Sequence, residues 1–427
     1  MRNWITVARY LMETLLEKPA TSKRKIDVDA VGRIEDRSYR IIQALRADVF
    51  SPGNQKELEI RFTLAQVSEM LNLSAPTIKK YEKMDDPIVP KLDKQSNRKA
   101  YTLVQVNELR MRTKQMPWRA YDEEPCILAI QSFKGGVGKS TVATHLSQDF
   151  ALKGYRVLVI DVDPQGSSTL CFGINPDLDL DDKDTIYPYL SEQQSRGYDF
   201  STLHYAVRKT YWPNIDLIPA NLLLYNAEYE LAARAAQGDD FYLLKLKDGI
   251  DTIKDEYDII IIDPPPALGM ISLSVLNAAN ALVVPVPPSN VDFSSTAHFF
   301  TMLRQTMEAM ENRGFKIGFN FLKVLISRKD ERKSSHQEIA ENMRIAYDLD
   351  LVGTQLKDSA EIENAAQMFM TVLELQKPAA SRETYKRALR SIKAVGDEIE
   401  LEIRKTWPSH HEALVKSGSI SEQFNEK

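Results

Sequence analysis

Most of the chain after residue 125 alternates short apolar runs with longer amphipathic stretches. Four runs are almost continuously apolar, as strands of a parallel sheet are when helices cover both faces. Between the runs the apolar residues recur with a helical period, for instance over 139–153, where Gly154 follows at a position that suits a helix C-cap. The alternation predicts an α/β fold, a doubly wound and mostly parallel sheet with right-handed crossovers. The predicted strands are 127–132, 156–161, 215–219, 258–263, 281–286, 321–327 and 351–356.

The pattern before residue 125 is different. Helical periodicity over 1–50 predicts N-terminal helices, which we assign to dimerisation, and the residues SPGN at 51–54 interrupt it. The predicted domains are the N-terminal helices (1–55), a small helical domain (61–116), the α/β domain (125–400) and a C-terminal helix with a flexible tail (401–427). A linker is predicted over 117–125.

Composition narrows the class of protein. Of 427 residues, 43% are hydrophobic and 27% charged, which is ordinary for a globular protein and excludes disorder of the whole chain. No window reaches the roughly 18 consecutive apolar residues of a membrane span. The two cysteines stand in no metal-binding spacing. We therefore expect a cytoplasmic protein without a membrane partner.

Charge is unevenly divided along the chain. Residues 1–121 carry 23 lysine and arginine residues against 15 acidic ones, and the rest carries 32 against 45. Within the first part, residues 61–121 carry 12 against 6. A basic module joined to an acidic one indicates that the basic module meets a polyanion. A solvated basic surface is the alternative that charge alone leaves open.

A glycine-rich loop, KGGVGKST, follows the first predicted strand and opens a predicted helix, which is the setting of a phosphate-binding loop. Its glycines let backbone N–H groups approach phosphate oxygens, and the helix N-terminus adds partial positive charge. The loop departs from the ordinary pattern, because Phe133 stands where a glycine is expected and a second lysine, Lys134, opens the loop. We expect Lys139 to reach the β- and γ-phosphates and Ser140 to ligate Mg²⁺. The predicted nucleotide-binding residues of the loop are Lys134, Gly135, Gly136, Val137, Gly138, Lys139, Ser140 and Thr141.

Carboxylates end two of the predicted strands. Asp161 and Asp163 follow one buried strand, and Asp263 ends a run of four isoleucines. Ligands of open parallel sheets bind at the carboxyl ends of the strands, so these groups are expected to converge on the loop. A carboxylate in such apolar surroundings needs a cation or hydrogen-bond donors. We interpret Asp263 as the residue that holds Mg²⁺ through water, and Asp163 as the residue that orients the attacking water.

The stretches KGGVGKST, DVDPQGSS and IIIIDPPP, in this order, resemble the deviant Walker A, A′ and B boxes of the ParA/MinD ATPases. The stretch VVPVPPSNVDFSST is more similar to that of the large, plasmid-type ParA partition ATPases. The resemblance implies ATP and Mg²⁺ as cofactors, a homodimer, and a Lys134 that reaches the partner's phosphates. It also implies Pro287 and Pro288 near the adenine. The catalytic residues are then Lys134, Lys139 and Asp163.

Residues 62–82 have the spacing of a helix-turn-helix, with Asn72-Leu73-Ser74 as the turn. Ser74 is the expected N-cap of the second helix. Pro76 falls in the first turn of this helix, where the missing N–H of proline costs no helical hydrogen bond. Residues 87–101 read as a hairpin wing, similar to the wings of MerR-like winged helices. A small helical bundle used only for packing is the alternative. The predicted DNA-binding residues are Ser74, Ala75, Thr77, Lys79, Lys80, Arg98 and Lys99.

Two functions fit these features. The first is a partition ATPase: ATP closes a dimer that binds nucleoid DNA without sequence preference, and a ParB-like centromere-binding protein stimulates hydrolysis. In this interpretation the winged helix also binds an operator in double-stranded DNA and represses the operon. The second is a nucleotide-responsive transcriptional regulator in which hydrolysis is incidental. A MinD-like membrane switch would need a C-terminal amphipathic helix, which is not evident in this sequence. An iron–sulfur reductase would need cysteines in the spacing of a metal cluster, and the two cysteines here do not have it.

Overall fold

The computed structural model describes residues 27–50, 56–92, 99–192, 199–238, 241–315 and 317–421. The chain divides into two compact units, Met1–Lys56 and Glu57–Lys427. In the first unit, Val28–Phe50 forms helix α2, as the periodicity predicts. Its apolar residues Val31, Ile34 and Ile41 are exposed. The first part of the predicted helical region, residues 1–26, lies outside the described residues.

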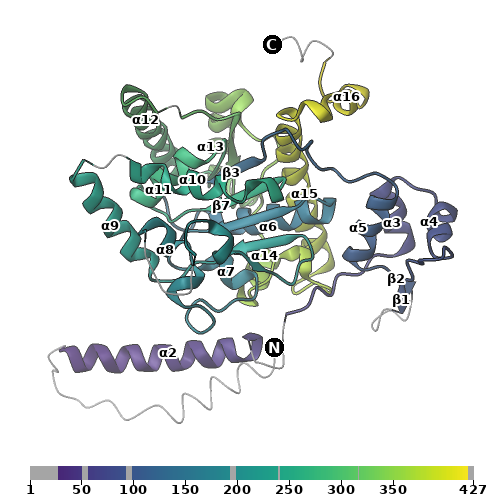
Figure 1. The fold of residues 1–427 in the computed structure, drawn as a ribbon, viewed down its shortest axis with the longest axis horizontal. Helices are drawn as coiled ribbons and strands as arrows, with labels where there is room; N and C mark the ends of the chain where they lie inside the picture. The colour runs from purple at the N-terminus through teal and green to yellow at the C-terminus, as the bar shows by residue number, and fades with distance from the viewer. Residues whose placement is uncertain are drawn as a thin grey trace. The chain divides into compact units, whose positions relative to one another are not determined.

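The second unit is built on a central sheet that has seven strands within the described residues (Figure 1). All neighbouring strands are parallel except the first pair, in which the two-residue edge strand β5, absent from the sequence prediction, runs antiparallel to β6. The doubly wound, mostly parallel sheet is therefore confirmed. In spatial order the strands are β5 (Arg208–Lys209), β6 (Ile215–Ile218), β4 (Val157–Asp161), β7 (Ile259–Asp263), β3 (Cys126–Ile130), β8 (Ala281–Val286) and β9 (Phe321–Ile326).

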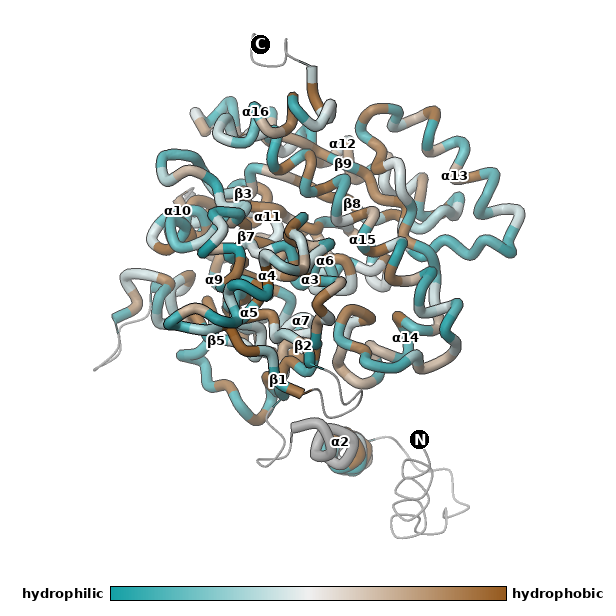
Figure 2. Tube along the Cα trace, turned by 90° about the vertical axis from the view of Figure 1, so that its right-hand side faces the viewer, coloured by the Kyte–Doolittle hydropathy of each residue, from teal (hydrophilic) through white to brown (hydrophobic). Residues whose placement is uncertain are grey.

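Helices cover both faces of this sheet. Alternate residues of β3 enter two different cores: Leu128 packs in the core that contains α6 and α15, and Ala129 packs in the core that contains α9 to α13. Figure 2 shows the hydrophobic residues of the strands in brown, whereas hydrophilic positions are frequent along α13 and α14. The helices are α6 (Lys139–Lys153), α7 (Ser167–Cys171), α8 (Tyr187–Leu190), α9 (Leu224–Ala236), α10 (Lys245–Asp251), α11 (Met270–Ala278), α12 (Asn290–Asn312), α13 (Ser334–Tyr347), α14 (Ala360–Gln367), α15 (Arg382–Lys405) and α16 (Pro408–Lys416).

Short 3-10 turns join several of these elements. They are η1 (Asp182–Asp184), η2 (Leu203–Ala206), η3 (Phe241–Leu243), η4 (Lys254–Glu256), η5 (Asp348–Asp350) and η6 (Val372–Glu374). Helix α6 has the predicted bounds, and Gly154 caps it in the left-handed conformation (φ 106°). Helix α15 crosses residue 400, the predicted end of the α/β domain.

The predicted strand 351–356 is wrong. Leu351 forms only an isolated bridge with Val324. The backbone N–H groups of Gly353 and Thr354 donate to the carboxylate of Glu398, at 2.7 and 2.8 Å. Because these two donors are taken by a side chain of α15, the segment cannot continue a backbone ladder.

The small domain contains three helices and a two-stranded antiparallel sheet. They are α3 (Leu64–Leu71), α4 (Ala75–Tyr81), β1 (Lys91–Leu92), β2 (Lys99–Ala100) and α5 (Leu103–Arg112). Thr63 and Thr102 begin α3 and α5 with capping boxes, and Ser74 caps α4 by accepting the N–H of Thr77. Helices and hairpin thus lie where the sequence predicts them. Their DNA binding stays a prediction, and Arg98 lies outside the described residues.

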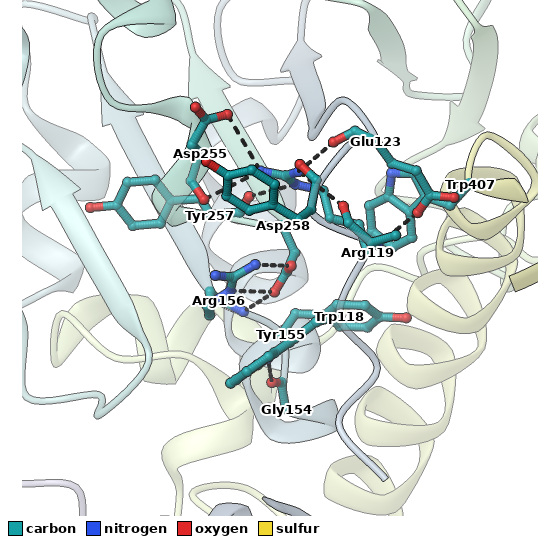
Figure 3. Close-up of polar contacts among 12 residues, drawn as sticks. Trp118, Arg119, Glu123, Gly154, Tyr155, Arg156, Asp255, Tyr257, Asp258 and Trp407 are labelled. Carbon is teal, nitrogen blue, oxygen red and sulfur yellow. Dashed lines mark hydrogen bonds and ion pairs between the residues drawn. The ribbon is translucent and has the colours of Figure 1, made fainter. Parts of the chain in front are cut away.

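The predicted linker packs closely against the α/β domain, and we call residues 117–125 the strap (Figure 3). The indole Nε1 of Trp118 donates to the carbonyl of Gly154, at the end of α6, at 3.0 Å. The buried guanidinium of Arg119 donates to backbone carbonyls, among them that of Tyr257 at 3.1 Å. Burying a guanidinium is costly unless its donors are satisfied, so these bonds fix the strap in place.

None of the helices in the described ranges combines the length and the apolar character that crossing a bilayer requires.

Candidate nucleotide-binding site

The glycine-rich loop lies between β3 and α6, at the carboxyl edge of the sheet. Gly136 and Gly138 have φ values of 75° and 97°, a left-handed conformation that glycine adopts without strain. Two groups that follow β9 hold the loop from outside: Ser327 Oγ donates to the carbonyl of Val137 and Arg328 to that of Gly136, both at 2.8 Å. The loop is therefore preformed, with helix α6 starting directly after Gly138.

Lys139 is almost completely buried at the start of α6. Its Nζ donates to the carbonyl of Lys134 at 3.4 Å. Burial lowers the pKa of Lys139, while the nearby carboxylates of Asp263 and Asp163 raise it. The ammonium group thus stands between the loop and two carboxylates, the position from which a lysine can bind phosphate oxygens.

Asp263 is completely buried at the end of β7. Its Oδ2 accepts the hydroxyl of Ser168 at 2.7 Å, and its Oδ1 has no hydrogen-bond partner among the described residues. Burial raises the pKa of Asp263, and the neighbouring hydroxyls of Ser140 and Ser168 lower it. An unpartnered buried carboxylate oxygen beside the Ser140 hydroxyl offers the hard oxygen ligands that Mg²⁺ prefers.

The two aspartates after β4 differ in their surroundings. The carboxylate of Asp161 accepts the N–H of Asp163 at 3.1 Å and both the N–H and the hydroxyl of Thr169 at 2.8 Å. Asp161 therefore stabilises the segment that runs from the end of β4 into α7. Oδ1 of Asp163 accepts the N–H of Gln165 at 2.9 Å, and the residue lines the cavity beside the glycine-rich loop. Burial raises the pKa of Asp163, whereas Gln165 and Lys139 lower it.

The glycine-rich loop forms one wall of a cavity of about 520 Å³. Sequence reasoning missed most of the remaining lining, and Leu356 of this lining falls in the wrongly predicted strand 351–356. Pro287 and Pro288 are not among the lining residues; Pro287 lines a much smaller neighbouring cavity with Phe133 and Lys134. Besides the loop and Asp163, the lining residues are Thr144, His145, Ser167, Leu170, Cys171, Pro266, Arg328, Leu356, Lys357, Asp358, Ser359, Ile362, Glu363, Ala366, Phe369 and Met370.

Lys134 points away from Lys139. Its Nζ forms an ion pair with Oδ1 of Asp292, in the first turn of α12, at 2.7 Å. Both side chains are partly exposed, so the pair is weak and easily exchanged for another anion. Lys139 therefore lines the cavity, whereas Lys134 is not among its lining residues and forms an ion pair with Asp292.

Those predicted DNA-binding residues that the structure describes are exposed, apart from Ala75, which is partly buried. Thr77, Lys79 and Lys80 are exposed on α4, and Lys99 is exposed on β2. Ile78, on the other side of α4, is completely buried. The helix therefore presents its polar face outward, as a helix that enters a DNA groove must.

The chain is similar to one protein family and to several known proteins. The family described as "AAA domain" matches residues 126–317. The chain is 30% identical over 380 residues to the "Putative replication protein A" of Rhizobium rhizogenes, covering 86% of this chain and 92% of the relative. It is 30% identical over 358 residues to "Protein SopA" of Escherichia coli K12, covering 81% and 89%.

Solved structures share the fold. A structure described as "Partition Protein" has a TM-score of 0.61 at 24% identity and covers 88% of this chain and 99% of its own. The complex of a Cyanothece McdA variant with ATP has a TM-score of 0.53 at 22% identity and covers 65% and 97%.

Proposed function

Since the chain belongs to the ParA family of partition ATPases, we propose that it binds ATP with Mg²⁺, dimerises and hydrolyses ATP to segregate DNA. One observation carries this proposal. The glycine-rich loop and the buried Lys139 line one cavity, and Asp263, whose Oδ1 is unpartnered among the described residues, lies next to Lys139 and Ser140 of this lining. Such a combination binds a polyphosphate together with a divalent cation.

The lining of the cavity has two chemically different parts, which gives the nucleotide a direction. The loop and Lys139 would bind the phosphates, and Ser140 with Asp263 would hold Mg²⁺, which neutralises developing charge on the phosphates. The rest of the lining includes the charged side chains of Lys357, Asp358 and Glu363 and a group of apolar side chains, among them Leu170, Ile362 and Phe369. We place the base against this apolar group, because flat apolar rings bind best between such side chains. Pro287 and Pro288 stay a prediction for the adenine.

Hydrolysis requires an oriented water and a neutralised leaving group. Asp163 keeps one carboxylate oxygen outside its bond to Gln165 and lines the cavity, so it can orient the attacking water. Lys139 stabilises charge on the phosphates. Lys134 would exchange Asp292 for the phosphates of a second copy, which couples dimerisation to nucleotide binding.

We extend the proposal to DNA and a protein partner. The ATP-bound dimer would bind double-stranded DNA of the nucleoid without sequence preference, and a ParB-like protein would stimulate hydrolysis. The exposed face of α4, with Lys79 and Lys80, would bind an operator. The 28% identity over 272 residues to the "Chromosome partitioning protein ParA" of Caulobacter vibrioides supports the partition function.

The test is ATP binding and turnover of the Lys139→Ala variant, measured with and without DNA and the product of the adjacent gene. We expect the variant to lose ATP–Mg²⁺ binding, because backbone amides alone do not neutralise the triphosphate. Lys247→Ala, at an exposed lysine of α10, is the matched control. Normal turnover of Lys139→Ala would refute the site. Operator binding that responds to nucleotide, without hydrolysis stimulated by the partner, would identify a transcriptional regulator instead.

A further inference from the structure

A buried polar network adjoins the cavity, and His145, one of its members, is itself a lining residue. The network joins the middle of α6 to residues 371–374, which include the turn η6 (Val372–Glu374). Phe369 and Met370, which line the cavity, immediately precede this segment. The side chains of the network are almost fully enclosed, so each of their bonds acts in a medium of low polarity.

His145 forms the first link of the network. Its Nδ1 donates to the carbonyl of Thr141, one turn earlier in α6, at 2.7 Å, and its Nε2 accepts the N–H of Val372 at 3.3 Å. These two bonds require the neutral ring with its proton on Nδ1, because a protonated Nε2 would face another donor. Burial lowers the pKa of His145 to about 4, in agreement with this neutral ring.

Gln148, one turn further along α6, forms the second link. Its Nε2 donates to Oε1 of Glu374 at 2.7 Å, and its Oε1 accepts the hydroxyl of Thr371. The other oxygen of Glu374 accepts the hydroxyl of Tyr211 at 2.7 Å. Both ends of the 371–374 segment are therefore attached to one helix.

The backbone of the cavity wall is strained where the network supports it. Phe369 has a φ of 52°, in the left-handed region that a bulky side chain rarely adopts. Such a conformation persists only when the surrounding contacts impose it. At the end of α14, the N–H groups of Phe369 and Met370 donate to the carbonyls of Ala366 and Ala365, which is the usual left-handed cap of a helix. The bonds from His145 and Gln148 hold the residues that follow this cap.

We propose that His145 and Gln148 are positioning residues for the nucleotide base, because they hold Phe369 and Met370 in the wall of the cavity. The inference rests on the proposed ATP binding and deepens it. Helix α6 then positions two parts of the nucleotide-binding site. Its N-terminus faces the phosphates, and its buried side holds the wall against which the base packs.

Comparing ATP with inorganic tripolyphosphate separates the base from the phosphates. For Gln148→Leu we expect the affinity for ATP and ADP, measured by calorimetry with Mg²⁺, to fall about tenfold or more, as for other changes of pocket shape. Tripolyphosphate affinity should stay within about twofold, since the glycine-rich loop is untouched. In turnover assays the KM for ATP should rise while kcat at saturating ATP is kept.

Two further variants control for loss of the fold. Ser147→Ala removes a buried hydroxyl next to Gln148, whose bond stays within α6, and should bind ATP as wild type does. The milder variant Tyr211→Phe removes only the hydroxyl that donates to the other oxygen of Glu374 and keeps the ring. It should weaken ATP binding less than Gln148→Leu does, again with tripolyphosphate affinity unchanged, and it gives a test even if Gln148→Leu does not fold.

A failure of the positioning role can be distinguished from a failure of the proposed ATP binding. Equal losses for ATP and tripolyphosphate in Gln148→Leu, or no loss for either, would overturn the positioning role. So would a Tyr211→Phe variant that loses affinity for ATP and for tripolyphosphate equally. Wild-type protein that binds neither ATP nor tripolyphosphate would refute the proposed function itself.

Discussion

The buried imidazole of His145 predicts a specific loss of stability in acid. In the folded protein the ring is almost fully buried, donates to Thr141 and accepts from Val372. Burial lowers its pKa from 6.5 to about 4. Replacing the ring by Asn, which keeps one donor and one acceptor, removes the titration and leaves most of the buried polar contact.

The sign follows from the two protonation states. Above pH 6.5 the ring is neutral in both folded and unfolded protein, and pH has no effect through this group. Between pH 6.5 and about 4 the unfolded chain binds a proton that the folded protein does not, so stability falls as the pH falls. The full difference corresponds to about 3 kcal/mol, at about 1.4 kcal/mol for each pH unit.

A buried carboxylate acts in the opposite direction. Burial raises the pKa of Asp149, on the same helix, from 3.8 to about 6. The folded protein therefore takes up a proton before the unfolded chain does, and this group adds stability as the pH falls from about 6 to about 4. The wild-type curve alone would hide the histidine effect, whereas the difference between wild type and His145→Asn cancels the contribution of Asp149.

The assay is urea unfolding of wild type and His145→Asn at several pH values between about 4.5 and 7.5. We expect the stability advantage of wild type over the variant to shrink by about 2–3 kcal/mol between about pH 7 and pH 4.5. A constant difference over this range would refute a neutral, buried His145. A difference that grows in acid would show that the ring is bound as a cation.

Three further predictions concern the proposed activity. Asp163→Ala should slow hydrolysis much more than it weakens ATP binding, because orienting water matters only in the chemical step; loss of nucleotide affinity instead would make Asp163 a structural residue. Lys134→Gln should keep ATP affinity but impair dimerisation and the partner's hydrolysis in mixed dimers, and wild-type turnover would show that the lysine acts within its own chain. Lys79→Ala/Lys80→Ala should lose discrimination of the operator in mobility-shift assays yet keep salt-sensitive, ATP-dependent binding to random DNA; loss of both would mean that one surface serves both.

The elements that sequence predicts well depend on short-range signals. The four apolar strands and α6 appear where expected, because a buried parallel strand and a helix ended by glycine are each specified within about fifteen residues. The segment 351–356 is also rich in apolar residues, as those strands are. It fails as a strand because Glu398, 45 residues away from Gly353, takes the N–H groups of Gly353 and Thr354 in its middle.

The candidate site shows the same division. The glycine-rich loop and the strand-end aspartates are visible in the sequence, since their spacing alone indicates their chemistry. That Asp161 binds Thr169 while Asp163 faces the cavity depends on contacts formed only in the folded chain. The wall at Phe369 and Met370 looks like ordinary apolar sequence until α14 and η6 place it in the lining of the same cavity as the loop.

Helix α6 connects these observations physically. Its first residue faces the phosphate site, its middle binds the cavity wall through Gln148, and the carbonyls at its end bind two other parts of the unit. The carbonyl of Leu152 accepts Arg110 of α5, in the small domain, at 2.7 Å, and that of Gly154 accepts Trp118 of the strap. A helix of fifteen residues is about 22 Å long, so α6 spans the distance between the glycine-rich loop and the contact with Arg110. The small domain is thus attached to the one element that, in the proposed complex, supports both the phosphates and the base of the nucleotide.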